Sequence, residues 1–414
     1  MKAGIITIGD ELLIGQTINS NIARIGKALT NIGIKVIQST TIQDDKQAIV
    51  NALDLFMHEF DLVIISGGLG PTKDDITKET LTAYFKTELE LNKEVLKHVE
   101  SFFTKKGKEM LSSNIHQAML PKKATVLENK LGTAPGMWFT KEEKIVISLP
   151  GVPYELEGLL ANQVIPKLSS MGLTTEIYHE TIMTIGIGES FLAEKIKDWE
   201  NRLYQDKLKL AYLPSPGLVK LRITSYNGEK DKIKIKAYID DIKKLIPEYL
   251  YSDCEESIFE TVGDLLRKKK QTIGTIESCT GGRIANSFVE IPGASDYLVG
   301  GLVTYSNEMK MNLAHVSLVS LNEFGAVSEE VAKEMALGGK KQLGCDYTIA
   351  VTGIAGPDGG SIEKPVGTVW VAVAHPNGIS TKKFQLNGNR ERNIEVTTLY
   401  AVNLLRKMIL GINP

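Results

Sequence analysis

In residues 272–289, TIGTIESCTGGRIANSFV, a short apolar run leads into small polar residues and two glycines, after which a helical pattern begins. We predict a strand over 272–276 and a helix over 283–289 from this change of pattern. Further strands are predicted at 301–305, 347–351 and 368–374, and one more helix is predicted at 257–269. Such alternation is typical of a parallel sheet covered by helices, so residues 253–414 are predicted to form an α/β domain.

The first 170 residues show the same alternation. Apolar strands are predicted at 3–8, 35–41, 62–66 and 144–149. Amphipathic helices are predicted at 21–31 and 46–60, and a further helix starts near Asp74 and Asp75. Residues 171–252 differ, because a strand, a helix, two strands and a helix follow one another. The predicted fold is therefore multi-domain α/β. Two α/β sandwich domains with parallel-rich sheets, residues 1–170 and 253–414, are joined by a small α+β module over 171–252.

Composition limits the class of protein. Of 414 residues, 43% are hydrophobic and 24% are charged, which is an ordinary globular mixture. The net charge of −2 gives no basic field, so no nucleic-acid or membrane partner is predicted. The three cysteines form no CxxC pair, and the apolar run before Asp10 is too short for a signal peptide. We therefore expect a cytoplasmic protein.

The turn that follows the strand at 272–276 has the composition of a nucleophile site. Ser278 stands at its start, and a helix N-terminus at its end can stabilise a developing oxyanion. The backbone N–H groups expected to face the attacked group are those of Gly281, Gly282 and Arg283. Serine needs a base, and Lys310 is the candidate because no Ser-His-Asp order is evident. The pKa of such a lysine must be lowered by burial or by cations, and Tyr305 can relay the proton or orient the pair.

Two alternatives remain open at this turn. Small residues between a strand and a helix often only cap the helix, and a lysine after a strand is usually solvated. Cys279 is a rival nucleophile, because a helix N-terminus lowers the pKa of a thiol. The turn alone is therefore compatible with a capped helix, a serine nucleophile or a cysteine nucleophile.

A glycine-rich turn, SGGLGPT at 66–72, follows the predicted strand at 62–66. Backbone amides of such a turn can cradle a phosphate, and the predicted contacts are Gly67, Gly68, Gly70 and Thr72. Carboxylates beside a phosphate imply a bridging divalent cation, Mg²⁺, Mn²⁺ or Co²⁺. The candidate ligands are Asp10, Glu11, Asp74, Asp75 and Glu155. The alternative is that Asp74 or Asp75 merely caps its helix.

Five motifs occur in order in the C-terminal third: ESCTGG at 277–282, GGLVTYSNEMK at 300–310, GAVS at 325–328, TGIAGP at 352–357 and KPVGT at 364–368. Together they resemble the CinA C-terminal domain, which is known as a nicotinamide-mononucleotide amidohydrolase. The resemblance implies that Ser278 is the nucleophile, that Tyr305 and Lys310 assist it, and that no cofactor is needed. The expected substrate contacts are Thr280, Gly281, Gly282, Thr352, Gly353 and Arg392, the last as a phosphate ligand or else a surface charge.

Three N-terminal motifs, GDELL at 9–13, the segment 66–77 and LPGVP at 149–153, resemble the CinA N-terminal domain of the molybdopterin-binding superfamily. That resemblance implies a metal-dependent ADP-ribose pyrophosphatase with metal or catalytic positions at Asp10, Asp74, Asp75 and Glu155. A molybdopterin-ligand role is the rival interpretation. The middle segment resembles the KH-like linking module of CinA proteins, but GIGE at 186–189 lacks the GXXG clamp of an RNA-binding KH domain.

These resemblances imply a bifunctional hydrolase of pyridine nucleotide recycling. The C-terminal site is expected to convert nicotinamide mononucleotide to nicotinic acid mononucleotide and ammonia through an acyl-enzyme, and the N-terminal site to cleave ADP-ribose. The alternative is a molybdopterin-like ligand-binding or competence accessory protein without hydrolase activity. The family also implies a homodimer.

Overall fold

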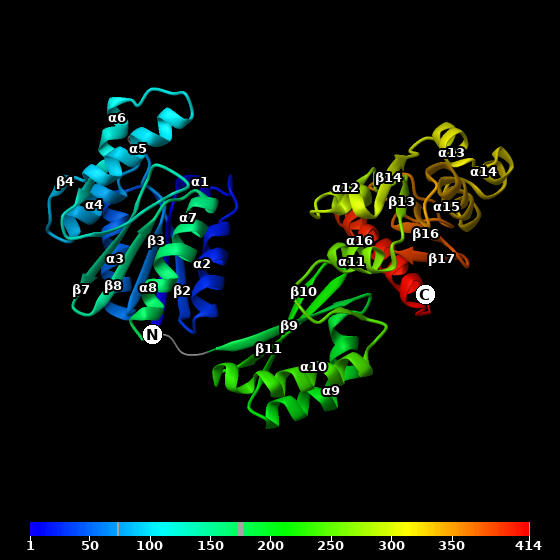
Figure 1. Ribbon diagram of the computed structural model, residues 1–414, viewed down its shortest axis with the longest axis horizontal. Coiled ribbons are helices and arrows are strands. Elements are labelled where there is room, and N and C mark those ends of the chain that lie inside the picture. Colours follow the sequence, from blue (N-terminus) through cyan, green and yellow to red (C-terminus); the bar gives the residue numbers. More distant parts are fainter. Residues whose placement is uncertain (73, 173–176, 414) are drawn as a thin grey trace. The chain divides into compact units, whose positions relative to one another are not determined.

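The computed structural model describes residues 1–72, 74–172 and 177–413, which fall into two compact units. One unit contains residues 1–178 together with 226–230, and the other contains 179–225 and the chain from 231 onward. Figure 1 shows that each unit is built from strands with helices packed beside them. The mixed α/β, multi-domain fold predicted from the sequence is confirmed.

The main sheet of the first unit has the strand order β2-β1-β3-β8-β7-β6. Strands β2, β1, β3 and β8 are parallel, and β7 and β6 extend the sheet in antiparallel fashion. The glycine turn after Ser66 and the turns after β1 and β8 therefore lie at one edge of the sheet. The strands are β1 (Lys2–Ile8), β2 (Lys35–Ile42), β3 (Leu62–Ser66), β6 (Thr125–Leu127), β7 (Gly136–Lys141) and β8 (Lys144–Leu149).

Helices cover both faces of this sheet, because alternate residues of a strand point to opposite sides. Ile5 packs in the core beneath α2 and α7, whereas Ile6 packs in the core beneath α3, α4 and α5. The helices are α1 (Asp10–Leu13), α2 (Ser20–Asn31), α3 (Lys46–Glu59), α4 (Thr77–Tyr84), α5 (Lys93–Lys105), α6 (Ser112–Ile115), α7 (Pro153–Leu159) and α8 (Ile165–Ser170), with η1 (His116–Ala118) and η2 (Leu160–Val164). Strands β4 (Leu89–Leu91) and β5 (Met119–Pro121) form a separate small sheet.

The KH-like module has a four-stranded sheet in the order β10-β11-β9-β12, with two helices against it. Trp199 of α9 is buried, and its indole N–H donates to the carbonyl of Tyr238 in α10 at 3.0 Å. This contact joins the two helices. The elements are β9 (Tyr178–Ile185), α9 (Glu189–Gln205), β10 (Lys209–Ser215), β11 (Leu218–Ser225), η3 (Gly228–Asp231), α10 (Lys232–Leu245) and β12 (Leu250–Ser252).

The C-terminal domain has a five-stranded sheet in the order β14-β13-β15-β16-β17, of which β14, β13 and β15 are parallel. Its strands are β13 (Ile273–Glu277), β14 (Leu298–Val303), β15 (Tyr347–Gly353), β16 (Thr368–His375) and β17 (Gly378–Gln385). One core holds α11, α12 and α16, and another holds α13, α14 and α15. These helices are α11 (Ile258–Lys269), α12 (Arg283–Val289), α13 (Asn307–Ala314), α14 (Leu318–Phe324), α15 (Glu329–Leu343) and α16 (Arg390–Leu410), with η4 (Ala294–Asp296).

One predicted strand of this domain has different bounds in the structure, and one strand was not predicted. The strand expected at 301–305 runs over 298–303, so the carbonyls of Thr304 and Tyr305 are left outside the strand. Strand β17 was missed, because its half-exposed residues include Lys382 and Lys383 and give no apolar run. The predicted helix at 283–289 is α12, with the same bounds.

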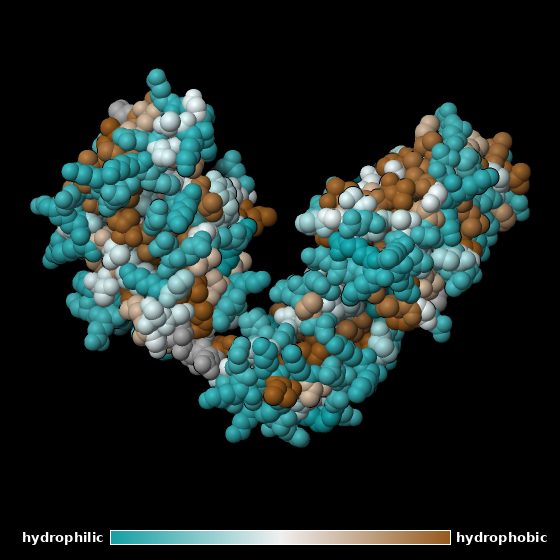
Figure 2. All heavy atoms as spheres, viewed as in Figure 1, coloured by the Kyte–Doolittle hydropathy of each residue, from teal (hydrophilic) through white to brown (hydrophobic). Residues whose placement is uncertain are grey.

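The face of the molecule drawn in Figure 2 carries mostly hydrophilic side chains with hydrophobic ones scattered among them. Within the ranges that the structure describes, no helix combines the length and the apolar character needed to cross a bilayer.

Candidate active site

Ser278 lies in the turn between β13 and α12, where its backbone N–H donates to the carbonyl of Val351 in β15 at 3.0 Å. Gly281 and Gly282 adopt φ values of +61° and +96°. Glycine is favoured in this left-handed region because it has no Cβ. The two glycines thus let the chain reverse directly after the strand and leave Ser278 at the carboxyl edge of the sheet.

The Lys310 side chain, from α13, meets Ser278 at this edge. Its Nζ lies 3.0 Å from Ser278 Oγ, 3.0 Å from the carbonyl oxygen of Thr304 and 3.1 Å from that of Tyr305. Lys310 is only 2% exposed and Ser278 only 8%. The two side chains that the sequence predicted to act together are therefore in hydrogen-bond contact.

The environment of Lys310 favours the neutral amine. Burial lowers the pKa of Lys310, and the nearby Cys279 opposes this only as a smaller effect. Among the salt bridges of the described residues, none involves Lys310. The two carbonyls can only accept, so Lys310 donates to both of them, and its Nζ is also within hydrogen-bond distance of Ser278 Oγ, where a base for that hydroxyl would stand.

The prediction that three backbone N–H groups of this turn form an oxyanion hole is wrong, because each of them donates to an acceptor within the protein. Gly281 N donates to Ser278 O at 3.1 Å, and Arg283 N donates to Thr280 O at 3.1 Å. Gly282 N donates to the carboxylate of Glu277 at 3.0 Å. These groups close the turn and are not available to a substrate.

Glu277, which the sequence analysis overlooked, organises this turn. Its fully buried carboxylate also accepts from the backbone N–H groups of Ile284 and Ala285, at 3.0 and 2.9 Å, and from Thr275 Oγ1 at 3.0 Å. A carboxylate at a helix N-terminus is stabilised by the helix dipole and by charge-assisted hydrogen bonds. Its place in a strand, rather than at the helix cap, hid this role from the sequence.

Two buried hydroxyls beside the Ser278–Lys310 pair lack a partner in the part of the chain that the structure describes. They are Oγ1 of Thr280 and Oγ1 of Thr304, on residues 4% and 0% exposed. A buried polar atom without a hydrogen bond costs free energy, so its presence needs an explanation. Thr280 is two residues after Ser278, and its hydroxyl is a candidate donor to the attacked group.

At the mouth of the site the exposed Tyr305 side chain meets Arg390, the first residue of α16. Arg390 donates to the Tyr305 hydroxyl at 3.4 Å and to the carbonyl of Gly356 at 2.7 Å. The bond that the structure gives for the Tyr305 hydroxyl is thus with Arg390, whereas a proton relay would need one with Ser278 or Lys310; its other predicted role, orienting the pair, stays a prediction.

The guanidinium that contacts Tyr305 belongs to Arg390 and not to Arg392, the residue predicted from the sequence as a phosphate ligand, whose substrate role stays a prediction. Arg392 is exposed, and its backbone N–H takes part in the cap of α16 by donating to Asn389 Oδ1 at 2.9 Å. Side chains two residues apart in an α-helix point about 200° apart around the helix axis. The guanidinium that meets the site is therefore the one on residue 390.

The predicted contacts at the end of β15 are placed near Ser278 but are used within the protein. Thr352 is 1% exposed, and its hydroxyl donates to the carbonyl of Ala326 at 2.7 Å, so it is not a free donor for a substrate. Gly353 packs closely against β16, because a Cβ there would lie 2.8 Å from Val369 Cγ2. Its substrate role stays a prediction.

Cys279 does not have the properties of a nucleophile. Burial raises the pKa of its thiol to about 12. A backbone hydrogen bond opposes this rise, Glu277 adds to it, and Lys310 and Arg390 lower the pKa more weakly. The thiolate expected from a helix N-terminus is therefore not favoured, and Ser278 remains the candidate nucleophile.

In the first unit, the glycine turn has the conformation that its sequence predicts. Gly67 and Gly68 have φ values of +119° and +65°, and a Cβ on Gly67 would lie 2.3 Å from the carbonyl oxygen of Ile8. The amides of Gly70 and Thr72 donate to the carboxylate of Asp75, at 2.8 and 3.0 Å. Asp75 therefore closes the turn and occupies the amides of Gly70 and Thr72, which were predicted as phosphate contacts, whereas its metal role stays a prediction.

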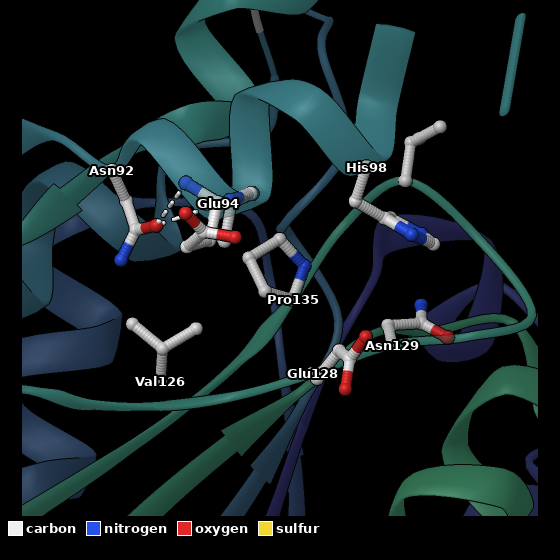
Figure 3. A pocket seen from close by; sticks show the side chains of 9 residues that line it. Asn92, Glu94, His98, Val126, Glu128, Asn129 and Pro135 are labelled. Atoms are coloured by element: carbon white, nitrogen blue, oxygen red, sulfur yellow. Dashed lines mark hydrogen bonds between the residues drawn. The ribbon is translucent and has the colours of Figure 1, made fainter. Parts of the chain in front are cut away.

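Glu155, which the sequence predicted as a metal ligand, is held within the protein, and its metal role stays a prediction. It is 8% exposed, and its carboxylate accepts from Asn129 Nδ2 at 2.6 Å. Asn129 lies on the wall of a cavity of about 360 Å³, with Glu128 beside it and His98 opposite (Figure 3). Glu155 thus fixes the loop that lines this cavity.

The remaining carboxylates gather where β1 and β2 end. Asp44 Oδ2 accepts from the backbone N–H of Asp10 at 3.1 Å. The pKa of Asp44 is raised by burial, lowered by the hydrogen bond from the Asp10 amide, and raised more weakly by the charges of Asp10, Glu11 and Asp74. Within the described ranges no three His, Cys, Asp or Glu side chains are placed to hold a metal ion, so the predicted four-carboxylate set is not formed.

Comparison with known proteins gives matches along the whole chain. Residues 255–409 match the CinA C-terminal domain, 179–252 match the damage-inducible protein CinA KH domain, and 4–170 match a family described as "Probable molybdopterin binding domain". A CinA-like protein of Flavobacterium psychrophilum is 44% identical over 417 residues, which is 99% of both chains. Another, of Cytophaga hutchinsonii, is 44% identical over 409 residues, which is 98% of both chains.

A solved structure of a competence/damage inducible protein from Agrobacterium tumefaciens is 34% identical to this chain. The match covers 37% of this chain and 96% of that one, with a TM-score of 0.36. From the family matches and the full-length identities, the chain belongs to the CinA family.

Proposed function

We propose that the C-terminal site hydrolyses the carboxamide of nicotinamide mononucleotide to nicotinic acid mononucleotide and ammonia. The observation that carries the proposal is the 3.0 Å contact between Lys310 Nζ and Ser278 Oγ in a buried site. A serine attacks an amide only when a base removes its proton, and a desolvated lysine is such a base.

In the proposed reaction, Lys310 takes the Ser278 proton while Oγ bonds to the carboxamide carbon. The tetrahedral intermediate then breaks its C–N bond, and ammonia leaves with the proton that Lys310 returns. Lys310 next takes a proton from a water molecule, whose oxygen attacks the carbonyl carbon of the nicotinoyl ester. The bond to Ser278 Oγ then breaks, Lys310 returns the proton to Oγ, and the acid product loses its own proton to solvent as the carboxylate. Arg390, at the mouth of the site, supplies a guanidinium suited to bind the 5′-phosphate.

The experiment is to incubate the full chain with nicotinamide mononucleotide and follow ammonia together with nicotinic acid mononucleotide. Equal amounts of the two products support the proposal. Absence of both would instead favour a binding or accessory protein.

The Thr280 hydroxyl is expected to donate to the oxyanion of the intermediate. Thr280→Val keeps the shape of the side chain and removes the donor, so kcat should fall by about 100-fold with little change in KM. Steady-state ammonia release measures this. Thr398→Val is the control, because that hydroxyl is buried and satisfied by the Ile394 carbonyl in α16. An unchanged kcat in Thr280→Val would remove Thr280 from the mechanism.

We propose that the first unit cleaves the pyrophosphate of ADP-ribose with a divalent cation. The support is the glycine turn and the neighbouring Asp10 and Asp44 at the same sheet edge. Mg²⁺ is commonly held by one or two carboxylates plus substrate phosphates, so a preformed set of three ligands is not required. Asp10 and Asp44 would hold the cation, which would supply charge neutralisation at the phosphates.

This second proposal is tested with the full-length Ser278→Ala chain, ADP-ribose and Mg²⁺, Mn²⁺ or Co²⁺. AMP and ribose 5-phosphate should form, and EDTA should stop their formation. Asp44→Asn should slow cleavage, whereas Asp54→Asn, which alters an exposed carboxylate bonded to Tyr84, should not. No AMP with any of the three metals would favour a molybdopterin-like ligand role instead.

A further inference from the structure

A cavity of about 630 Å³ lies in the second unit where β17 and α16 meet the KH-like module. The KH-like module contributes the turn after β9 and the segment before β12. Its volume lies within the range of roughly 300–1,000 Å³ that is usual for small-molecule sites. The described residues that line the cavity include neither Ser278 nor Lys310, so it is separate from the proposed active site.

One wall of this cavity carries positive charge that is not neutralised. Lys382 and Lys407 both line it, and the ion pairs of the described residues include neither. Beneath them Arg406, 2% exposed, donates only to neutral acceptors, among them the carbonyls of Leu250 and Glu248 at 3.1 Å. The pKa of Lys407 is lowered by burial and then by the charges of Lys382 and Arg406.

The carboxylate of Glu248 also lines the cavity, but it already pairs with Lys195 at 3.4 Å. Two lysines therefore line the cavity beside one carboxylate that has a partner of its own, and the buried Arg406 adds a third positive charge behind them. Like charges held together in a partly buried site repel one another, and a bound anion would relieve that repulsion.

The same two elements, β17 and α16, also offer aromatic surface and an amide donor to the cavity. The rings of Phe384 and Tyr400 lie 5.1 Å apart between centroids, and both line the cavity. Asn403 Oδ1 accepts from Arg406 Nε at 3.0 Å, which fixes the amide so that Nδ2 points away from the arginine. Asn403 Nδ2 lies 3.7 Å from the point that a Cβ on Gly186 would occupy. Gly186 has a φ of +79°, and because it has no side chain, no Cβ covers its backbone there.

We infer that this cavity is a nucleotide-binding site, with the phosphate between Lys382 and Lys407 and the base against Phe384 and Tyr400. Paired lysines bind phosphate oxygens through charge-assisted hydrogen bonds, and aromatic rings stack on bases. The site joins the KH-like module to the C-terminal domain and goes beyond the proposed hydrolase activities. It does not depend on either of them.

Lysine acylation followed by mass spectrometry tests the site in the unmodified full chain. AMP should protect Lys382 and Lys407 from an amine-reactive reagent, and Lys383 should react as before. Lys383 is the matched internal control, since it is the next residue of β17 and alternate strand residues face opposite sides. Ribose 5-phosphate and inorganic phosphate, in separate arms, should protect less than AMP.

Variants give an independent measurement by calorimetry. Lys382→Gln and Lys407→Gln should each weaken AMP binding by about tenfold or more, because each removes a charge-assisted contact. Lys383→Gln should bind as the parent does. Unchanged affinity in both cavity variants, or no protection of either lysine at millimolar AMP, would overturn the proposal. Equal protection by inorganic phosphate would overturn the assignment to a nucleotide.

Discussion

Replacing Ser278 with alanine is expected to abolish ammonia release from nicotinamide mononucleotide, with kcat lowered about 10⁴-fold or more. The site has no second activated nucleophile, since the raised pKa of Cys279 keeps its thiol protonated. The hydrogen bond that the structure gives for the Ser278 hydroxyl is the one to Lys310, so the variant should fold normally. Product formation and the melting temperature measure the two effects separately.

Cys279→Ala is the matched control for this prediction. The neighbouring residue lies in the same turn and is equally buried, yet its loss should leave much of the activity. An inactive Cys279→Ala beside an active Ser278→Ala would reverse the assignment of the nucleophile.

Changing Lys310 should have an effect of nearly the same size. Lys310→Ala removes the base, and kcat should fall about 10³-fold or more. Lys310→Arg should be comparably inactive although it keeps the positive charge, because a guanidinium does not give up its proton. A small amine such as ethylamine, added to Lys310→Ala, should restore part of the rate, with nicotinic acid mononucleotide as the readout.

The pH dependence gives a further test of Lys310. A base acts when neutral, so kcat/KM should rise with pH as Lys310 loses its proton and fall off below that pH. Because burial lowers the pKa of Lys310 below its ordinary value of 10.5, this limb should lie below pH 10.5. A Lys310→Arg variant as active as the parent, with the same pH profile, would contradict a role as base.

The sequence predicted the elements that carry apolar periodicity and the pair of residues at the C-terminal site. Strands such as β3 and β15 are continuous buried runs, and α12 starts where the glycines end. Ser278 and Lys310 were paired because a serine needs a base, no Ser-His-Asp order is evident and a Ser-Lys pair is a known alternative. In the structure Ser278 follows β13, and Lys310 lies in α13, the helix after the neighbouring parallel strand β14. Segments that follow neighbouring parallel strands meet at the carboxyl edge of the sheet.

What the sequence did not predict depends on the direction of single side chains. Glu277 turns into the helix end and takes the amide of Gly282, which the motif alone had assigned to the substrate. Arg390 and Arg392 are both plausible from spacing, and only the start of α16 at Arg390 distinguishes them. In the first unit, carboxylates with the chemistry of metal ligands proved to be structural acceptors at Asp75 and Glu155.

The carboxylate that caps α12 has a consequence for product release in the proposed reaction. A bare helix N-terminus attracts anions, and the proposed hydrolysis would turn a neutral carboxamide into a carboxylate beside this turn. Because Glu277 already occupies the amides of Gly282, Ile284 and Ala285, that carboxylate would find no free amides there. In the proposed reaction the turn would therefore not retain the anionic product, which would favour turnover over product inhibition.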